Sequence, residues 1–439
     1  MLFSVILFFL VVVTLVGILE LFARYMVYGQ GRYLKEIDPA AFKLLETLDP
    51  VSQLEKPVYI PDSKFGWRHS PDNEGFYRGE RYPRAEFRSK VKFNSSGYRS
   101  SSEFSQDPAI QRIAVLGDSF VEAIQVPEED TFPKVIEKKL KSDGYPFSVY
   151  NFGLLGTGTV HQIQILKYDV LKYKPRIVIL TFFGNDLIDN SPYYLKSPSF
   201  LTPNYERNGS NVVLGEFGQK TNIPTKGTLS KNDFIVPPRA VADNNLERER
   251  MRQTISKISG PILFLKFFNE LFHDKILPRI DDEIQFDVYK KDYSPALQES
   301  LDVTVDLIAE MKRECAQIEA YFLVVMVPAR EQVYKNYFAD YFRQRKKILD
   351  PSNYDVKKPQ NVLSQELKAR KIDCLDLLTD FRRLGEKNRL YYKTDGHFNQ
   401  LGHQMAGELI TEYLLSGYLK NENCENFSEF LGQNSVDSH

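Results

Sequence analysis

After residue 110, short apolar runs alternate along this chain with longer segments in which apolar residues recur at helical spacing. The run 113–116 is continuously apolar, as in a buried strand, and the segment from Asp130 or Thr131 to about Lys141 has apolar residues at helical spacing. We predict further strands at 148–151, 176–183, 320–327 and 372–378, and further helices at 160–173, 294–318, 361–370 and 401–415. Strands that alternate with helices pair in parallel, so the sequence predicts a doubly wound α/β sheet with its ligand site at the carboxyl ends of the strands.

The amino end has a different pattern. Residues 2–19 are apolar apart from three small or hydroxyl residues, and a helix needs about 20 such residues to cross the hydrocarbon core of a membrane. A cleaved signal peptide is the alternative, but its apolar region usually has only about 7–15 residues. In addition, no Lys or Arg precedes the run and no small-x-small cleavage site follows it. The pattern therefore predicts a transmembrane anchor at 1–25.

The orientation of this anchor depends on few charges. Arg24, Arg32 and Lys35 lie on its carboxyl side, and the positive-inside rule would then place the bulk of the protein in the cytoplasm. Acidic residues lie among these three, however, so the charges alone leave the orientation open.

Two regions interrupt or precede the main α/β pattern. Residues 26–108 are rich in Tyr, Arg, Pro and Gly and contain one alternating stretch, 85–93, which predicts a strand; we expect a membrane-proximal stalk and a small β element packed on the main domain. The main domain spans 109–420, with an insertion at about 190–292, and a polar tail follows at 421–439. Within the insertion, the apolar patch 262–268 is too short to span a bilayer and predicts a packed helix, or alternatively a lid over the site.

Composition narrows the classes of function. With 439 residues, 42% of them hydrophobic, the chain can bury a sizeable core. The formal net charge of −1 and the lack of a long basic run argue against a nucleic-acid partner. The three cysteines, Cys315, Cys374 and Cys424, are too widely spaced for a disulfide framework or a zinc site, so we expect no metal and no cofactor.

Four stretches contain residues that could take part in catalysis. Three of them follow predicted strands, and one lies near the carboxyl end. The first strand ends in Gly-Asp-Ser at 117–119, the second in the glycine-dense loop 151–158, and the third in Gly-Asn-Asp at 184–186. Asp395-Gly396-His397 follows much later. Because the ends of parallel strands meet at one edge of a sheet, these distant stretches are expected to converge.

These ordered blocks resemble those of the SGNH/GDSL hydrolase family, over about 113–190 and 362–415. The resemblance implies a flavodoxin-like three-layer sandwich. It also implies Ser119 as nucleophile, Gly156 and Asn185 as oxyanion donors together with the Ser119 amide, His397 as base and Asp395 as its partner.

One departure from the family pattern concerns the last block. The family usually has Asp-x-x-His, whereas Asp395-Gly396-His397 is one residue shorter, a spacing similar to that of relatives such as the alginate O-acetyltransferases. We expect Gly396 to turn the backbone sharply enough to bring the carboxylate and the imidazole together. The departure leaves the acyl acceptor open.

Ester cleavage by a serine requires the same types of residue. A serine hydroxyl is a weak nucleophile at neutral pH and needs an imidazole to take its proton, and the imidazole needs a carboxylate to fix its tautomer. Structural interpretations remain for each residue alone: Ser119 as a helix cap, His397 as a core histidine and Asn185 as a turn residue. A second histidine, His403, is expected to be structural. The Gly-x-Ser-x-Gly elbow of α/β-hydrolases is absent, since Val121 occupies the place of its last glycine.

The sequence thus predicts a membrane-anchored serine esterase that removes an O-acyl group from a glycan or lipid through an acyl-Ser119 intermediate. An O-acyltransferase that modifies an envelope polysaccharide is the first alternative, and a non-catalytic envelope-assembly or glycan-binding protein is the second. The resemblance to family members with a single amino-terminal anchor outweighs the charge rule, so we expect a single-pass membrane protein whose catalytic domain lies outside the cytoplasm. The sequence does not identify any protein partner.

Overall fold

The computed structural model describes residues 52–79, 85–191, 205–208, 211–214, 286–334, 337–339, 350–393 and 395–421. The predicted anchor at 1–25, the apolar patch 262–268 with most of the insertion, and the tail beyond residue 421 lie outside these ranges. Within the described ranges, no helix combines the length and the apolar character that crossing a membrane requires.

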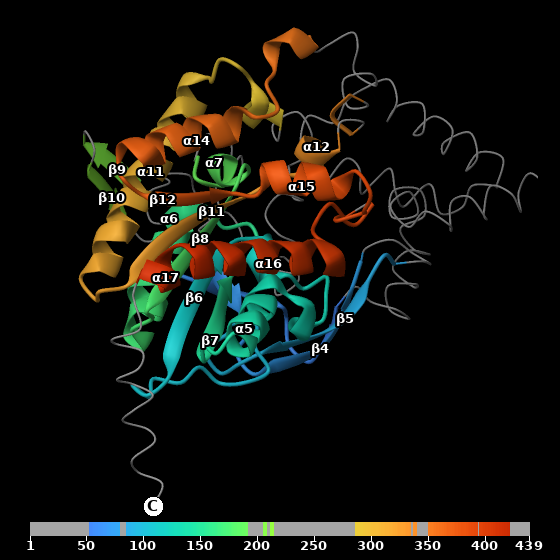
Figure 1. Ribbon diagram of the computed structural model, residues 1–439, viewed down its shortest axis with the longest axis vertical. Helices are drawn as coiled ribbons and strands as arrows, with labels where there is room; N and C mark the ends of the chain where they lie inside the picture. Colours follow the sequence, from blue (N-terminus) through green and yellow to red (C-terminus); the bar gives the residue numbers. More distant parts are fainter. Residues whose placement is uncertain are drawn as a thin grey trace, which may run out of the picture.

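A five-stranded parallel sheet forms the centre of the molecule (Figure 1). Its strands are β6 (Gln111–Gly117), β7 (Phe147–Gly153), β8 (Ile177–Phe183), β11 (Tyr321–Val327) and β12 (Asp373–Asp376). They lie in the order β12-β11-β8-β6-β7, so the first strand of the sheet is flanked by the second and the third. This is the flavodoxin-like order of a doubly wound sheet, as predicted.

Helices cover both faces of the sheet. Alternate residues of each strand point to opposite faces of the sheet. The buried apolar residues accordingly form one large cluster on each face. Residues of α5 (Phe132–Ser142), α15 (Leu378–Gly385) and α16 (Gln400–Ser416) pack on one face; α5 and α16 lie side by side (Figure 1). Residues of α6 (Thr159–Ile165), α11 (Pro295–Ala316) and α14 (Lys358–Ala369) pack on the other face.

The structure differs from the predicted elements in two places. The predicted helix 160–173 is regular only in α6; a π-helical turn follows at Leu166–Val170 and a 3-10 turn at Leu171–Tyr173. The buried carboxylate of Asp169 in this π turn accepts a hydrogen bond of 2.7 Å from the Tyr98 hydroxyl, a long-range contact that no local pattern reveals.

The second difference is at the last strand, which was predicted at 372–378 but ends at Asp376. The Asp376 carboxylate accepts a hydrogen bond of 2.9 Å from the Leu378 amide, and the unpredicted helix α15 begins there. A short acidic side chain that bonds the backbone two residues ahead commonly starts a turn or a helix. The other predicted elements agree with the structure to within three residues at each end.

The segment before the sheet forms five short strands. β1 (Ser52–Leu54), β4 (Asn73–Arg78) and β5 (Arg88–Phe93) make one antiparallel sheet, and β2 (Tyr59–Asp62) and β3 (Gly66–His69) make a second. We call residues 52–108 the amino-terminal β segment. The insertion contributes one described hairpin, formed by β9 (Tyr205–Asn208) and β10 (Asn211–Leu214).

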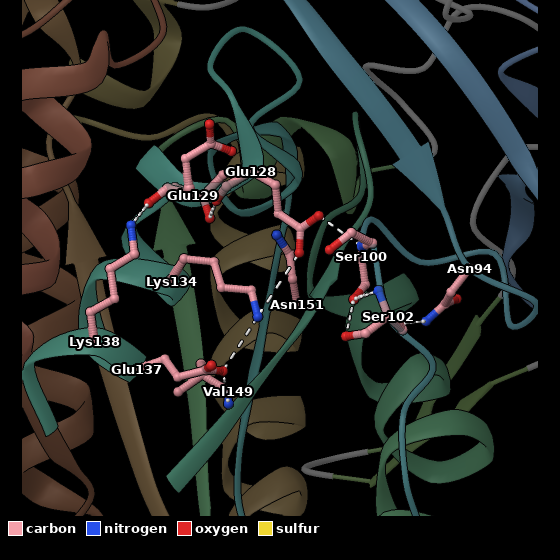
Figure 2. A network of polar contacts seen from close by, with 12 residues as sticks. Asn94, Ser100, Ser102, Glu128, Glu129, Lys134, Glu137, Lys138, Val149 and Asn151 are labelled. Carbon is pink, nitrogen blue, oxygen red and sulfur yellow. Dashed lines mark hydrogen bonds and ion pairs between the residues drawn. The ribbon is translucent and has the colours of Figure 1, made fainter. Parts of the chain in front are cut away.

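Polar contacts connect the amino-terminal β segment to the main sheet. Figure 2 shows a network that runs from the Asn94–Ser102 loop to the region of α5. The amide of Ser101 donates to Glu128, which faces Lys134 of α5 at 3.9 Å. Lys134 contacts Glu137 at 3.4 Å, and Glu137 accepts a hydrogen bond from the Val149 amide of β7 at 2.8 Å. Burial raises the pKa of Glu137, but this amide and the neighbouring lysines outweigh burial and lower it.

Candidate active site

Ser119 lies at the sharp turn between β6 and the short helix α4 (Ser119–Glu122). A Cβ at Gly117 would overlap the Thr181 hydroxyl, so only glycine fits where the strand ends. The Asp118 carboxylate accepts a hydrogen bond of 3.0 Å from the Phe120 amide and caps α4. The cap of this helix is therefore Asp118, and the interpretation of Ser119 as a helix cap is wrong.

Ser119, His397 and Asp395 lie within hydrogen-bonding distance in series. His397 Nε2 is 2.8 Å from Ser119 Oγ, and His397 Nδ1 is 2.5 Å from Asp395 Oδ1. A carboxylate can only accept, so Nδ1 carries the proton and Nε2 is free to accept the serine proton. The structure thus joins three residues that are up to 278 positions apart.

Gly396 allows the short spacing between the carboxylate and the imidazole. Its φ of +90° lies in the left-handed region, which glycine adopts without a Cβ penalty. The turn is closed by a hydrogen bond of 2.9 Å from the Tyr392 amide to the His397 carbonyl, and residues Tyr391 and Phe398 form a β-bridge at its base. The backbone therefore reverses direction within the Asp395–His397 stretch, as expected for Gly396.

Charges around His397 favour its protonated form. Burial lowers the pKa of His397, but the charge and hydrogen bond of Asp395, with Asp118 and Glu122, outweigh burial and raise it above its usual value. Burial raises the pKa of Asp395, but the charge and hydrogen bonds of His397, with Arg330, outweigh it and lower that pKa. Asp395 is thus a carboxylate at neutral pH, opposite an imidazole of enhanced basicity.

The other two predicted residues follow the strands that flank β6. Gly156, with φ +71°, lies in the loop after β7, whose Leu154 amide donates to the Gly117 carbonyl at 3.1 Å. Asn185 follows β8 and precedes α7 (Asp186–Asp189); its Nδ2 donates to Asp189 Oδ2 at 3.0 Å. A side-chain amide has two N–H donors, so one remains for a ligand.

Carboxylates gather behind the turn that presents Ser119. Asp118, Asp186 and Asp189 are all buried. Burial, with the charges of Asp118 and Asp189, raises the pKa of Asp186 well above its usual value. Burial and neighbouring like charges both disfavour the ionised form of a carboxyl group. Within the described ranges, no group of three His, Cys, Asp or Glu side chains is placed to hold a metal ion.

His403 is buried in α16 and lies apart from the serine–histidine–aspartate series. Its Nδ1 accepts a hydrogen bond of 3.4 Å from the Phe132 amide, and burial lowers its pKa to about 3. A neutral, buried imidazole that bonds a helix amide has a structural role, as expected from the sequence.

Three residues near the site have no signal in the sequence. Trp67 of β3 donates from Nε1 to the Leu155 carbonyl at 3.0 Å, next to Gly156. Arg330, at the start of α12 (Arg330–Val333), donates to the Lys393 carbonyl at 2.6 Å. Glu86 accepts hydrogen bonds from two amides of the same loop. All three act through contacts between residues that are distant in the sequence.

Comparisons with known proteins agree with this geometry. The family described as GDSL-like lipase/acylhydrolase matches residues 113–259, and the family described as SGNH hydrolase-like domain, acetyltransferase AlgX, matches residues 289–429. No curated protein matches the sequence closely enough to count as a relative.

Several solved structures are similar to the chain. One is TesA, at 13% identity and a TM-score of 0.34, over 69% of this chain and 98% of that one. Another is the acetyl xylan esterase AlAXEase, at 11% identity and a TM-score of 0.34, over 69% and 99%. A third is the lipase/acylhydrolase from Enterococcus faecalis, at 12% identity and a TM-score of 0.35, over 70% and 95%.

The two family matches cover different parts of the site. The first contains Ser119, Gly156 and Asn185, and the second contains Asp395 and His397. The parallel sheet brings these parts together, with Ser119 and His397 in hydrogen-bonding distance. The chain is therefore a member of the SGNH/GDSL hydrolase family, a hydrolase that acts on carboxylic ester bonds.

Proposed function

We propose that this protein is a serine esterase that removes an O-acyl group from a glycan through a covalent acyl-Ser119 intermediate. The observation that supports it best is the continuous hydrogen-bonded series from Asp395 through His397 to Ser119, with distances of 2.5 and 2.8 Å. A nucleophile, a base and an orienting carboxylate in this order are the arrangement by which serine hydrolases transfer acyl groups.

In this proposal, Ser119 Oγ attacks the ester carbonyl carbon while His397 Nε2 takes the hydroxyl proton. Asp395 stabilises the imidazolium that forms. The negative charge on the acyl oxygen is met by the amides of Ser119 and Gly156 and by Asn185 Nδ2. The intermediate expels the alcohol, which receives the proton from His397. Water then attacks the carbonyl carbon of acyl-Ser119 while His397 takes a proton from the water. The second intermediate expels Ser119 Oγ, which receives that proton, and the acyl group leaves as the acid. Loss of one oxyanion donor typically costs about 10²–10³ in rate, or about 3–4 kcal/mol.

A glycan is favoured over a lipid as the substrate. The carboxyl-terminal part of the chain matches a family whose description names the acetyltransferase AlgX, and this match contains both Asp395 and His397. The same match favours one second candidate, an O-acyltransferase, in which a sugar hydroxyl replaces water as the acceptor of the acyl group.

The position of the protein in the cell belongs to the same proposal. An acylated envelope glycan is reached from outside the cytoplasm, which requires residues 1–25 to anchor the chain with its catalytic domain on the outer side. Protease treatment of intact cells tests this orientation. Digestion of the catalytic domain without lysis supports it, and protection of that domain until lysis contradicts it.

Two measurements test the activity. The full chain is treated with a fluorophosphonate probe beside the Ser119→Ala variant; we expect labelling of the wild type alone. Equal labelling of both, or no labelling of a folded wild type, contradicts the proposal and leaves the non-catalytic glycan-binding alternative. Hydrolysis of a small aryl acetate is then measured with and without an oligosaccharide. Faster acyl transfer to the sugar than to water would identify a transferase instead of an esterase.

A further inference from the structure

We infer that Glu86 is a positioning residue of the active site, which holds the backbone of the loop that carries Asp395. The inference rests on the proposed function of Asp395 and His397. Glu86 Oε1 accepts a hydrogen bond of 2.9 Å from the Lys393 amide, and Glu86 Oε2 accepts one of 3.0 Å from the Asp395 amide. Each carboxylate oxygen therefore bonds one amide, and one of these amides belongs to Asp395 itself.

The opposite side of the same loop is held by Arg330. Its Nη1 donates to the Lys393 carbonyl at 2.6 Å, and the guanidinium lies 3.9 Å from the place that a Cβ would take at Gly396. Lys393 is thus held at both ends, its N–H by a carboxylate and its carbonyl by a guanidinium. Hydrogen bonds to ionised groups are shorter and about twice as strong as those between neutral groups.

This loop needs external support because of its short spacing. Asp395 and His397 are separated only by Gly396, which adopts φ +90°. Glycine is the residue with the largest backbone freedom, so the Asp395–His397 geometry is not fixed by the local chain. Fixing the Asp395 amide from outside restricts the orientation of its carboxylate toward His397 Nδ1.

Glu86 belongs to a part of the chain that neither family match includes, since these matches begin at residues 113 and 289. Its neighbour Phe87 is buried, and the Phe87 ring lies 5.1 Å from the Tyr392 ring of the loop. The Phe87 carbonyl accepts a hydrogen bond of 3.1 Å from the Gly79 amide of the amino-terminal β segment. This segment therefore reaches the catalytic loop directly.

Two substitutions separate position from charge. Glu86→Gln removes the charge and replaces one acceptor oxygen by an N–H donor that cannot bond the facing amide. Glu86→Asp keeps the charge but is one methylene shorter, so it cannot reach both amides. Since a misplacement of about 1 Å can cost about 10²-fold in rate, we expect both variants to lose about 10- to 100-fold in kcat with little change in KM. Glu74→Gln is the control, because Glu74 is a partly exposed residue of the same segment that pairs with Lys90 at 2.8 Å.

A second readout is independent of turnover. We expect NMR titration of the His397 imidazole, assigned with the His397→Gln variant, to show a lower pKa in both Glu86 variants and an unchanged pKa in Glu74→Gln. Circular dichroism and Tm establish that each variant is folded. A folded Glu86→Gln with the kcat and the His397 pKa of the wild type overturns the inference, and so does a Glu86→Asp variant that retains both. If the wild type shows no Ser119-dependent turnover, the proposed function fails, and the His397 titration still decides the role of Glu86.

Discussion

Gly396 shows how one residue sets the geometry of the whole site. At φ +90°, any other residue is strained by the contact between its Cβ and the backbone, while the surrounding space is open, with the nearest atoms at 3.9 Å. The requirement for glycine is therefore conformational and not steric crowding by neighbours.

We expect Gly396→Ala to lower kcat by about tenfold, because a left-handed non-glycine residue costs about 1–2 kcal/mol and the loop relaxes away from the productive geometry. Gly144→Ala is the matched control, since Gly144 has φ +87° with nothing within 4 Å and lies at the far end of α5. Steady-state kinetics and thermal denaturation of both variants provide the measurement. An equal loss of kcat in the two variants would contradict the prediction.

The charge balance at His397 predicts the pH dependence of the reaction. The base must be neutral to accept the serine proton, and Asp395 raises its pKa above the usual value. The acid limb of kcat/KM should therefore have its midpoint above about 6.5, the usual pKa of histidine. Activity is lost as the pH falls through this midpoint.

Asp395→Asn should move the acid limb to lower pH and reduce kcat by about 10³–10⁴-fold, since the charge that raises the pKa and the acceptor that fixes the tautomer both disappear. Asp380→Asn serves as the control, because Asp380 is a partly exposed residue of α15 that pairs with Arg383 at 2.9 Å. A full pH–rate profile of the two variants tests this. The prediction is wrong if Asp395→Asn retains the wild-type acid limb.

At the scale of elements, the position of the loop after β7 depends on contacts with β3. The only tryptophan of the chain, Trp67, bonds the Leu155 carbonyl, and its ring is 3.6 Å from the place of a Cβ at Gly156. The loop that contains Gly156 is therefore held by a strand more than 80 residues earlier in the sequence.

Trp67→Phe keeps an aromatic ring but removes the hydrogen bond to Leu155. Such a bond contributes about 1 kcal/mol, and we expect kcat to fall about three- to tenfold, because the Gly156 amide is less well placed for the developing oxyanion. Kinetics with the aryl acetate measure the effect. Unchanged kcat in a Trp67→Phe variant of lowered Tm would assign Trp67 to stability alone.

For the whole molecule, buried contacts join the amino-terminal β segment to the sheet. The hydroxyl of Tyr59 donates to Glu122 at 2.7 Å, and His69 Nε2 lies 2.9 Å from the same carboxylate oxygen. The fully buried Arg99 donates to the carbonyls of Glu122, Ala123 and Val126. Glu122 belongs to α4, the helix that begins at Ser119, so these contacts hold the element that carries Ser119.

These contacts predict that the two parts unfold together. Trp67 fluorescence reports on β3 and its contact with the loop after β7, and far-ultraviolet circular dichroism reports mainly on the helices around the sheet. If the two parts unfold together, the two thermal transitions coincide. We expect Arg99→Met to lower both midpoints equally, since it leaves buried carbonyls without donors at a cost of about 1–3 kcal/mol each. Two separate transitions in the wild type would show that the segment is an independent unit.

The sequence by itself determined the sheet and the stretches of chain that form the site. The predominantly apolar runs at 113–116, 176–183 and 320–327 are typical of strands buried between two layers of helices, and this is a local property of the chain. The blocks at Ser119 and Asn185 follow from the same logic, because strand ends meet at one edge of a parallel sheet, whereas His397 in a later loop was indicated by the resemblance to the family.

Only the tertiary structure decided how that edge is held in place. Trp67, Glu86 and Arg330 bond to loops that lie 88, 307 to 309 and 63 residues away in the sequence, respectively. A side chain that supports a distant loop produces no periodicity and no motif in the sequence, because the residue type required there depends on the distant partner and not on the neighbouring residues. The Tyr98 hydroxyl bonds Asp169 in the π-helical turn after α6 across 71 positions, whereas the Asp376 bond at the start of α15 spans only two residues.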